Sequence, residues 1–283
     1  MQNAGLAALG LDWRYVACEV LPETLKEALA GAAAMRFLGV NLTVPHKLLA
    51  VPMMDVLDAS ARRWGAVNTV RFEGRDAEGS WKPLAELADD AVTATRMHGF
   101  NTDADAIVRS ILEDTGVAVA GAKVLLLGAG GAGRVAALRL AVEDVAELWL
   151  VNRTESKAAE LAAEIPRIVP GFRGQVRLGY PEGAVDLVVN ATSAGLKPRD
   201  PLPYDGARFD PSRASAAYDM IYRPAETPFL AAARQAGCRI ANGLGMLLYQ
   251  GAAALEIWSG RKAPVAEMRT ALWRHVYGER IAP

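Results

Sequence analysis

A glycine-rich turn in the middle of the chain constrains the fold more than any other feature. The run Gly128-Ala129-Gly130-Gly131-Ala132-Gly133 fits the pattern GxGxxG. It follows a short apolar run at 124–127 and opens a helix-like stretch, rich in alanine and leucine, that reaches about Val145. In that context the glycines allow a tight turn, and the helix N-terminus can bind a pyrophosphate. The pattern predicts a dinucleotide-binding unit, although a turn that serves only strand–helix packing would look the same.

Further apolar runs extend this unit along the second half of the chain. They lie at 148–151, 186–190, 216–221 and 239–241, and they alternate with loops or helix-like stretches, one of which reaches about Ile165. Short apolar runs without polar alternation are typical of parallel strands that are buried on both faces. We therefore expect a Rossmann-type, doubly wound parallel sheet.

The first hundred residues predict a smaller α/β domain. Strand-like runs at 13–20, 37–44 and 67–72 surround a helix-like stretch at 22–35. A polar stretch at 73–98 has no clear period, so we interpret it as an inserted loop or hairpin. From about Leu244 onward the pattern is helical.

Composition restricts the classes of protein to which the chain can belong. The chain has 283 residues, 52% of them hydrophobic, which suits about two folded domains. Its 31 Lys and Arg residues balance 32 Asp and Glu residues, and a net charge of −1 argues against a nucleic-acid partner. The longest uncharged run, 240–255, is shorter than a bilayer span, and no signal-peptide pattern is present. Cys18 and Cys238 stand far apart, so we expect reduced thiols and a cytoplasmic protein.

The end of the second predicted strand of the dinucleotide unit indicates which nucleotide is preferred. NAD-binding folds place an acidic residue about 20 positions after the glycines, where it contacts the ribose 2′-hydroxyl. Here the sequence reads Asn152-Arg153-Thr154, followed by Lys157. The guanidinium of Arg153 can hold a 2′-phosphate, and Lys157 adds a positive charge. The pattern favours NADP(H); the alternative is a solvated Arg153 beside Thr154 as a helix N-cap.

Lys47 lies where a lysine is electrostatically disfavoured. Pro45 is a favoured first helical residue, so Lys47 falls in a first helical turn, near the positive end of the helix dipole. Residues that break local rules tend to mark functional sites. From these residues alone, an exposed surface lysine is the simpler interpretation.

Asp103 and Asn68, like Lys47, can each be explained by local structure alone or by a functional role. Thr102 or Asp103 can act as the N-cap of a helix that begins there. Asn68 interrupts a strand-like run, where asparagine is disfavoured, and a turn would explain it. The three histidines, His46, His98 and His275, have no ligand spacing, so we expect no metal site.

Taken together and in order, these segments resemble the shikimate dehydrogenase family with its quinate/shikimate relatives. The matching segments are NLTVPHK at 41–47, GAVNTV at 65–70, GFNTD at 99–103, VLLLGAGGAGR at 124–134, VNRT at 151–154, VNATSAGL at 189–196, YDMIYRPAETPFL at 218–230 and NGLGMLLYQGAAALEIW at 242–258.

The resemblance implies the NADPH-dependent, reversible reduction of 3-dehydroshikimate to shikimate, a step toward chorismate and the aromatic amino acids. It also implies that Lys47 and Asp103 meet in an interdomain cleft and form the catalytic dyad. Lys47 would supply the proton, and Asp103 would orient Lys47 and bind the substrate.

The same matching implies further binding residues and the domain boundaries. The substrate would contact Thr43, Asn68, Tyr222 and Gln250. The cofactor would contact residues 128–133, Asn152, Arg153, Thr154, Thr192, Met220 and Gly243. A substrate domain would span 1–102 and be completed by helices at 245–283, with an NADP domain at 103–244. A monomer or a homodimer is expected.

One departure from the family concerns its first strand and Ser-x-Ser turn, which bind the substrate carboxylate and normally belong to the small domain's sheet. Met1-Gln2-Asn3-Ala4 resembles the helix that follows that turn. We expect a gene start further upstream. Otherwise the protein binds its substrate differently, or it no longer turns over shikimate. The alternatives are a quinate or aminoshikimate dehydrogenase, or a non-catalytic NADP(H)-binding protein.

Overall fold

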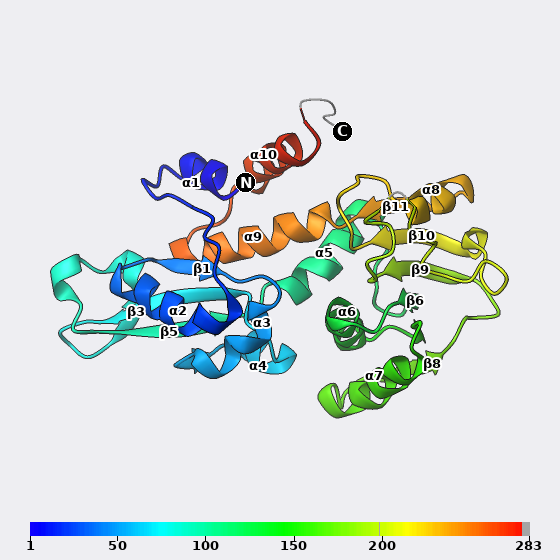
Figure 1. The fold of residues 1–283 in the computed structure, drawn as a ribbon, viewed down its shortest axis with the longest axis horizontal. Helices are drawn as coiled ribbons and strands as arrows, with labels where there is room; N and C mark the ends of the chain where they lie inside the picture. The colour runs from blue at the N-terminus through cyan, green and yellow to red at the C-terminus, as the bar shows by residue number, and fades with distance from the viewer. Residues whose placement is uncertain (198, 279–283) are drawn as a thin grey trace. The chain divides into compact units, whose positions relative to one another are not determined.

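The structure, a computed structural model, describes residues 1–197 and 199–278 and divides the chain into two compact units (Figure 1). The first unit comprises Met1–Asp103 and the chain from Gln250 onward, and the second comprises Ala104–Tyr249. The nucleotide motif therefore lies in the second unit.

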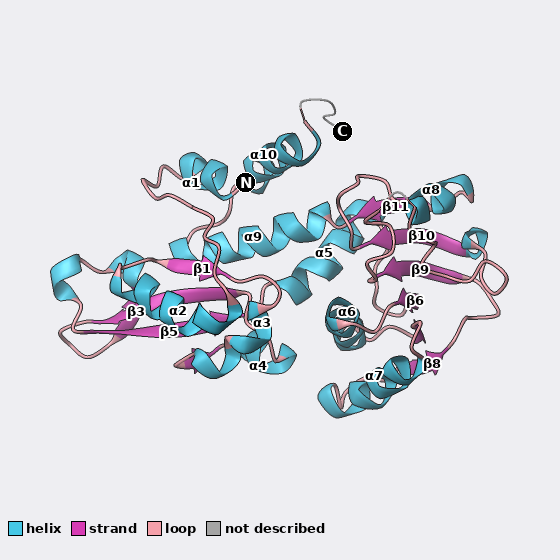
Figure 2. Ribbon diagram, viewed as in Figure 1, coloured by secondary structure: helices cyan, strands magenta, loops and turns pink. Residues whose placement is uncertain are grey.

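The second unit is built on a six-stranded parallel sheet (Figure 2). Its strands are β6 (Lys123–Leu127), β7 (Glu147–Val151), β8 (Gln175–Leu178), β9 (Val185–Asn190), β10 (Ala214–Asp219) and β11 (Arg239–Asn242). The order is β11-β10-β9-β6-β7-β8. The order reverses between β6 and β9, which is the point where such sheets bind nucleotides. The predicted doubly wound α/β fold is confirmed, although β8 was not predicted.

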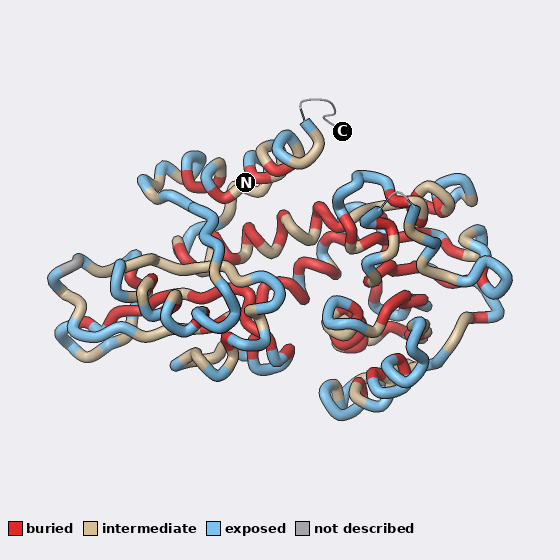
Figure 3. The backbone as a smooth tube through the Cα atoms, viewed as in Figure 1, coloured by how far each residue is buried: buried red, intermediate tan, exposed pale blue. Residues whose placement is uncertain are grey.

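Helices cover this sheet because its strands are apolar on both faces. The helices of the second unit are α5 (Asp103–Thr115), whose first residue belongs to the other unit, α6 (Gly131–Val142), α7 (Glu155–Ile168) and α8 (Pro228–Gln235), with the start of α9 (Leu244–Ser259). On one face, Leu125 and Val188 pack with Phe229 and Leu230 of α8. Figure 3 shows the central strands β6, β9 and β10 as largely buried, whereas the edge strands β8 and β11 are exposed or half-buried. Burial of these apolar runs is the main contribution to the stability of the sheet.

The first unit contains a five-stranded mixed sheet. Its strands are β1 (Gly39–Asn41), β2 (Val56–Leu57), β3 (Thr69–Arg75), β4 (Trp81–Pro83) and β5 (Ala94–Phe100). Strand β3 pairs antiparallel with β1, β4 and β5, and β2 pairs parallel with β5. The α-helices are α1 (Gln2–Ala8), α2 (Leu25–Ala34), α3 (His46–Leu49), α4 (Ala59–Trp64), the rest of α9, and α10 (Val265–Tyr277). Short 3-10 helices lie at Pro22–Thr24, Val51–Met53, Leu84–Glu86 and Asp89–Ala91, with another in the second unit at Pro211–Arg213.

The stretch 73–98 forms the β3–β4 hairpin and most of β5, so the hairpin alternative is confirmed and the stretch belongs to the sheet. One expectation for this unit is wrong. The stretch 13–20 is not a strand. A strand exists only where its backbone pairs with a neighbour, and no ladder to this stretch occurs among the described residues. Figure 3 shows this stretch as mostly exposed. The predicted strand at 37–44 is shortened to β1.

Within 1–197 and 199–278, no helix is both long enough and apolar enough to cross a membrane.

Candidate active site

Lys47 and Asp103 form an ion pair within the first unit. Lys47 Nζ lies 2.8 Å from Asp103 Oδ2, and the two side chains are 27% and 12% exposed. A charge-assisted hydrogen bond of this length, partly shielded from water, fixes the ammonium in one place. The predicted boundary assigned Asp103 to the nucleotide domain, whereas in the structure it belongs to the same unit as Lys47.

Asn101 positions Asp103 at the start of α5. Asn101 Oδ1 accepts a hydrogen bond from the backbone N–H of Asp103 at 3.1 Å, and Asn101 Nδ2 donates to the carbonyl of Ala66 at 3.1 Å. An asparagine that accepts from a first-turn amide satisfies one of the open donors of a helix start. The Asp103 carboxylate is therefore directed to Lys47 instead. Sequence reasoning missed Asn101, although the asparagine within GFNTD was visible.

Lys47 is held by the chain on both sides of it. The segment from β1 to α3 passes through the cis peptide bond Val44–Pro45, and α3 is only four residues long. The backbone carbonyl of Lys47 accepts a hydrogen bond from Val67 N at 2.9 Å. Pro45 occupies the N-cap position of α3. The prediction that it is the first helical residue is therefore wrong.

Asn68 is the centre of a buried polar network next to this pair. Its side-chain oxygen accepts from the N–H of Thr102 at 2.9 Å, and its Nδ2 donates to Thr102 Oγ1 at 3.0 Å. Asn41 Nδ2 donates to Asn68 O and to Thr69 Oγ1, and Tyr15 donates its hydroxyl to Asn41 Oδ1 at 3.0 Å. These bonds explain an asparagine at the start of β3, because a buried amide needs its partners.

The other expected substrate residues are divided between the units. Thr43 is exposed and lies between β1 and α3. Gln250 is half-buried on α9 in the first unit. Tyr222 belongs to the second unit and is 37% exposed.

The glycine turn has the geometry of an anion cradle. Gly128 has a φ of +107°, which favours glycine. A Cβ on Gly133 would lie 2.0 Å from the carbonyl oxygen of Gly128, so only glycine allows α6 to approach β6 this closely. Around Gly130 and Gly131, which are exposed, a Cβ would meet nothing within 4 Å. The free N–H groups at the start of α6 therefore face open space, which fits a pyrophosphate.

Asn152 connects this turn to the loop after β7. Its Oδ1 accepts from the N–H of Ala129 at 3.0 Å, and its Nδ2 donates to the carbonyl of Thr154 at 2.8 Å. Thr154 stands at the N-cap position of α7 but makes no side-chain cap bond. Arg153 and Lys157 are exposed at the start of this helix, as a 2′-phosphate contact requires.

Two buried polar residues organise the loops after β9 and β10. Asn190 Oδ1 accepts from the N–H and the hydroxyl of Thr192, and Asn190 Nδ2 donates to Asp219 Oδ1 at 3.0 Å. Asp219 Oδ2 also accepts from Thr227 Oγ1 at 2.6 Å. Burial raises the pKa of the Asp219 carboxyl, and its hydrogen bonds oppose that shift. Sequence reasoning missed both residues; their signal was a polar side chain at the end of a buried strand.

Three residues expected at the cofactor follow the strands β9, β10 and β11: Thr192, Met220 and Gly243. Thr192 packs close to Gly128, because a Cβ on that glycine would lie 2.9 Å from Thr192 Cγ2. Met220 follows β10, and a Cβ on Gly243 would lie 2.2 Å from the Met220 carbonyl oxygen. The structure thus brings Gly128 and Thr192 together, and separately Met220 and Gly243.

In the described part of the chain, no group of three or more His, Cys, Asp or Glu side chains is arranged to hold a metal ion. Cys18 is an exposed thiol and Cys238 a buried one.

A doubly wound sheet with a glycine cradle, in a chain that also carries a hydrogen-bonded lysine–aspartate pair, defines the class of dinucleotide-dependent oxidoreductases. Comparison with known proteins identifies the family. The model of the shikimate dehydrogenase substrate binding domain matches residues 1–70, that of shikimate / quinate 5-dehydrogenase matches 107–195, and that of the shikimate 5'-dehydrogenase C-terminal domain matches 243–272.

Individual relatives agree with these matches. The shikimate dehydrogenase (NADP(+)) of Moorella thermoacetica is 43% identical, with 95% of this chain and 85% of the relative covered. A crystal structure of a shikimate dehydrogenase in complex with NADP+ superimposes with a TM-score of 0.79 at 32% identity, covering 97% of this chain and 89% of that one. The Thermus thermophilus enzyme in complex with NADP(H) and shikimate gives 0.77 at 34% identity, covering 96% and 92%. The chain belongs to the shikimate dehydrogenase family, as predicted.

Proposed function

We propose that this protein catalyses the NADP-dependent, reversible reduction of 3-dehydroshikimate to shikimate. The observation that carries the proposal is the 2.8 Å contact between Lys47 and Asp103 in a chain whose relatives are NADP-dependent shikimate dehydrogenases. An ammonium fixed by a carboxylate is a suitable proton donor to a carbonyl oxygen that becomes negative during reduction.

The two residues have different tasks in this mechanism. Lys47 gives its proton to the substrate oxygen during reduction and receives it back during oxidation. Asp103 holds the ammonium in position and accepts a hydrogen bond from a substrate hydroxyl, while Asn101 keeps Asp103 oriented. NADPH, when bound, supplies the hydride. The remaining work of the chain is to orient the substrate ring and to stabilise the developing charge.

Binding is divided between the two units in this proposal. Thr43, Asn68 and Gln250 of the first unit, with Tyr222 of the second, contact the substrate. The cofactor is held by the second unit, where the exposed amides at the start of α6 suit the pyrophosphate. Arg153 and Lys157 suit the 2′-phosphate, and Thr192, Met220 and Gly243 suit the nicotinamide half.

The cellular setting follows from the same chemistry. We propose a cytoplasmic enzyme, either a monomer or a homodimer, whose partners are small molecules and not nucleic acid. Two thiols that are not joined in a disulfide support a reducing compartment.

The decisive experiment is a matrix of steady-state kinetics with shikimate and quinate, each with NADP+ and NAD+. We expect kcat/KM to be highest for shikimate with NADP+. Highest values with quinate would assign the chain to the quinate branch of the family. Calorimetric binding of NADPH without any turnover of either substrate would instead identify a non-catalytic nucleotide-binding protein.

A further inference from the structure

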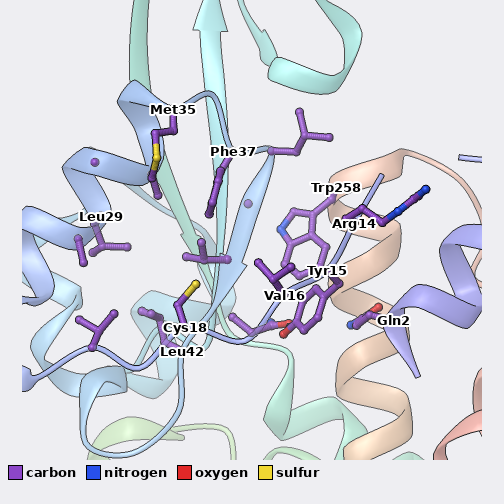
Figure 4. Close-up of a pocket in the computed structure, with 18 of the residues that line it drawn as sticks. Gln2, Arg14, Tyr15, Val16, Cys18, Leu29, Met35, Phe37, Leu42 and Trp258 are labelled. Carbon is purple, nitrogen blue, oxygen red and sulfur yellow. The ribbon is translucent and has the colours of Figure 1, made fainter. Parts of the chain in front are cut away.

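The apolar groove of the first unit is accounted for by the family resemblance. Val16, Leu29 and Trp258 line it (Figure 4), and it lies beside β1. The family's first strand belongs to the same sheet, so this groove is the expected place of that strand. A buried carboxylate in the second unit, that of Asp219, has no such explanation and no task in the proposed reaction.

The Asp219 carboxylate is surrounded by hydrogen-bond donors. Asp219 is the last residue of β10 and is fully buried. Its Oδ1 accepts from Asn190 Nδ2 and from the N–H of Ile221, both at 3.0 Å. Its Oδ2 accepts from Thr227 Oγ1 at 2.6 Å, and that oxygen already accepts from the N–H of Leu230. An ionised carboxylate only accepts hydrogen bonds, whereas a protonated one must also donate. Three donors around one carboxyl group therefore fit the ionised form.

No positive side chain balances this charge. Among residues 1–197 and 199–278, no lysine, arginine or histidine pairs with Asp219. Burial raises the pKa of the carboxyl, and the groups that lower it, on Thr227, Ile221 and Asn190, are all uncharged. Buried charges are normally paired, because an unpaired one is costly. A charge that breaks this rule marks a candidate for function.

The loops on both sides hold the carboxylate in one place. Asn190 lies opposite Asp219 in the β9–β10 pair and also accepts from the N–H of Thr192 at 3.0 Å. Thr227 is the N-cap of α8. A charge fixed by such bonds does not have to reorient when a ligand binds. Asp219 thus presents a preorganised negative charge at the carboxyl end of the sheet.

This end of the sheet is where the proposed function places the nicotinamide. The pyrophosphate cradle, residues 128–133, follows β6, and Arg153 of the adenosine half follows β7. A dinucleotide extends across the sheet in both directions from its pyrophosphate. Its nicotinamide half therefore extends to the other side of β6, toward β9 and β10. Met220, expected beside the nicotinamide, directly follows Asp219.

The two forms of the cofactor differ in charge at this ring. The nicotinamide is positively charged in NADP+ and neutral in NADPH, whereas the phosphates carry the same charge in both. A fixed negative charge near the ring therefore attracts the oxidised form selectively, and the attraction is strongest where protein excludes water.

We propose that Asp219 is the counter-charge of the oxidised nicotinamide, so that it sets the affinity for NADP+ relative to that for NADPH. This inference rests on the proposed function, because it needs NADP(H) at the glycine cradle. It assigns to Asp219 a role that differs from loop structure alone: discrimination between the two oxidation states of one cofactor.

The test is calorimetric titration of the full chain with NADP+ and, separately, with NADPH at about pH 8. Asp219→Asn removes the charge and keeps the shape, with the Thr227 oxygen able to accept from the new amide. Unit charges about 10 Å apart, at an effective dielectric constant of about 20, change an equilibrium constant roughly tenfold. We expect the ratio of the Kd for NADP+ to the Kd for NADPH to rise by that factor.

Two control variants separate charge from structure. Thr227→Val loses the hydroxyl that bonds Asp219 but keeps the carboxylate, so it should weaken both nucleotides equally and leave the ratio unchanged. Asp186→Asn removes an exposed charge at the other end of β9 and should also leave the ratio unchanged. A rescue variant, Asp219→Asn with Asn190→Asp, moves the carboxylate to the neighbouring strand and should return the ratio toward that of the parent protein.

An unchanged ratio in folded Asp219→Asn would overturn the proposal and leave the proposed function intact. So would a ratio that rises equally in Thr227→Val, because that variant keeps the charge. If Asp219→Asn does not fold, the parent protein still decides: NADP+ should bind it at least as tightly as NADPH, and clearly tighter binding of NADPH would contradict the assignment. Binding of neither nucleotide to the parent protein would overturn the proposed function together with this inference.

Discussion

Lys47 and Asp103 hold each other's side chains in position through their ion pair, and neighbouring residues hold both in place. Asp103 is fixed by the Asn101 cap, and the Lys47 carbonyl accepts from Val67, so neither side chain has to be ordered when substrate binds. Order that exists before binding lowers the entropic cost of reaching the reactive geometry. At the scale of single residues, the lysine–aspartate pair is therefore preformed within one unit.

Replacing the lysine tests its role as the proton donor. We expect Lys47→Ala to lower kcat about 10²–10⁴-fold, because general acid catalysis typically contributes that factor. Its affinity for NADPH, measured by calorimetry, should stay close to that of the parent protein. Lys26→Ala, at an exposed position on α2, is the matched control. Unchanged turnover in Lys47→Ala would remove Lys47 from the mechanism.

Replacing the arginine after β7 tests the nucleotide preference. Arg153→Ala should weaken NADPH binding far more than NADH binding, because only NADPH offers a 2′-phosphate to the guanidinium. Loss of one charge-assisted pair corresponds to about 1.5–3 kcal/mol, or roughly 10- to 150-fold in Kd. Arg167→Ala, exposed near the end of α7, serves as the control. If both nucleotides lose affinity equally, Arg153 does not contact the phosphate.

Sequence reasoning found Lys47, Asp103 and Asn68 but could not tell chemistry from capping or a turn without the family resemblance. The reason is physical: the contacts that decide their roles join residues 34 to 56 positions apart. For the same reason Asn101, Asn190 and Asp219 were missed. Asn101 bonds to Ala66, 35 positions away, and Asn190 bonds to Asp219, 29 positions away, so no local pattern encodes these contacts.

At the scale of elements, β3 and β5 carry a charged cluster on one face of the first sheet. Glu73 is buried and accepts hydrogen bonds from Arg71 and Arg96, and His98 Nδ1 lies 3.0 Å from its Oε1. Burial alone would raise the Glu73 pKa, but the bonds from His98, Arg71 and Arg96 lower it to about 2. The cluster therefore joins two neighbouring strands through one ionised carboxylate.

This cluster predicts a pH dependence of stability. A carboxyl whose pKa is lower in the folded state stabilises the fold above its unfolded pKa, here about 4.5, and that stability is lost as the pH falls toward about 2. Glu73→Gln should lower the free energy of unfolding at pH 7 by about 1–3 kcal/mol. Denaturant unfolding at several pH values measures both effects. Parallel acid profiles for Glu73→Gln and the parent protein would refute this assignment.

The elements of the two sheets differed in how far the sequence revealed them. Strands β6, β7, β9, β10 and β11 are short apolar runs whose burial on both faces is visible in the residues. Strands β4 and β5 could not be located within the stretch 73–98 from the sequence. Strands with one polar face and a charged cluster lack a plain apolar run. The stretch 13–20 has a strand-like composition, but its pairing depends on a neighbour that the pattern cannot supply.

At the scale of the whole molecule, the two units should respond to different ligands. NADP+ alone should slow amide exchange at residues 128–133 and in the loops after β7 and β9. Shikimate alone should slow it at 41–47 and 101–103. Ligands stabilise the state that they bind, by about 2.7 kcal/mol at a concentration of 100 Kd. Exchange measured by mass spectrometry reads out both regions at once. Protection of 41–47 by NADP+ alone would contradict this division.

The second unit is one uninterrupted stretch, 104–249, set between the two parts of the first. Only two junctions in the chain join them, one at the start of α5 and one within α9. Evolution or an engineer can therefore exchange the nucleotide module as a single cassette. Coenzyme preference can then change while the acid–base pair, encoded entirely before the first junction, is inherited intact.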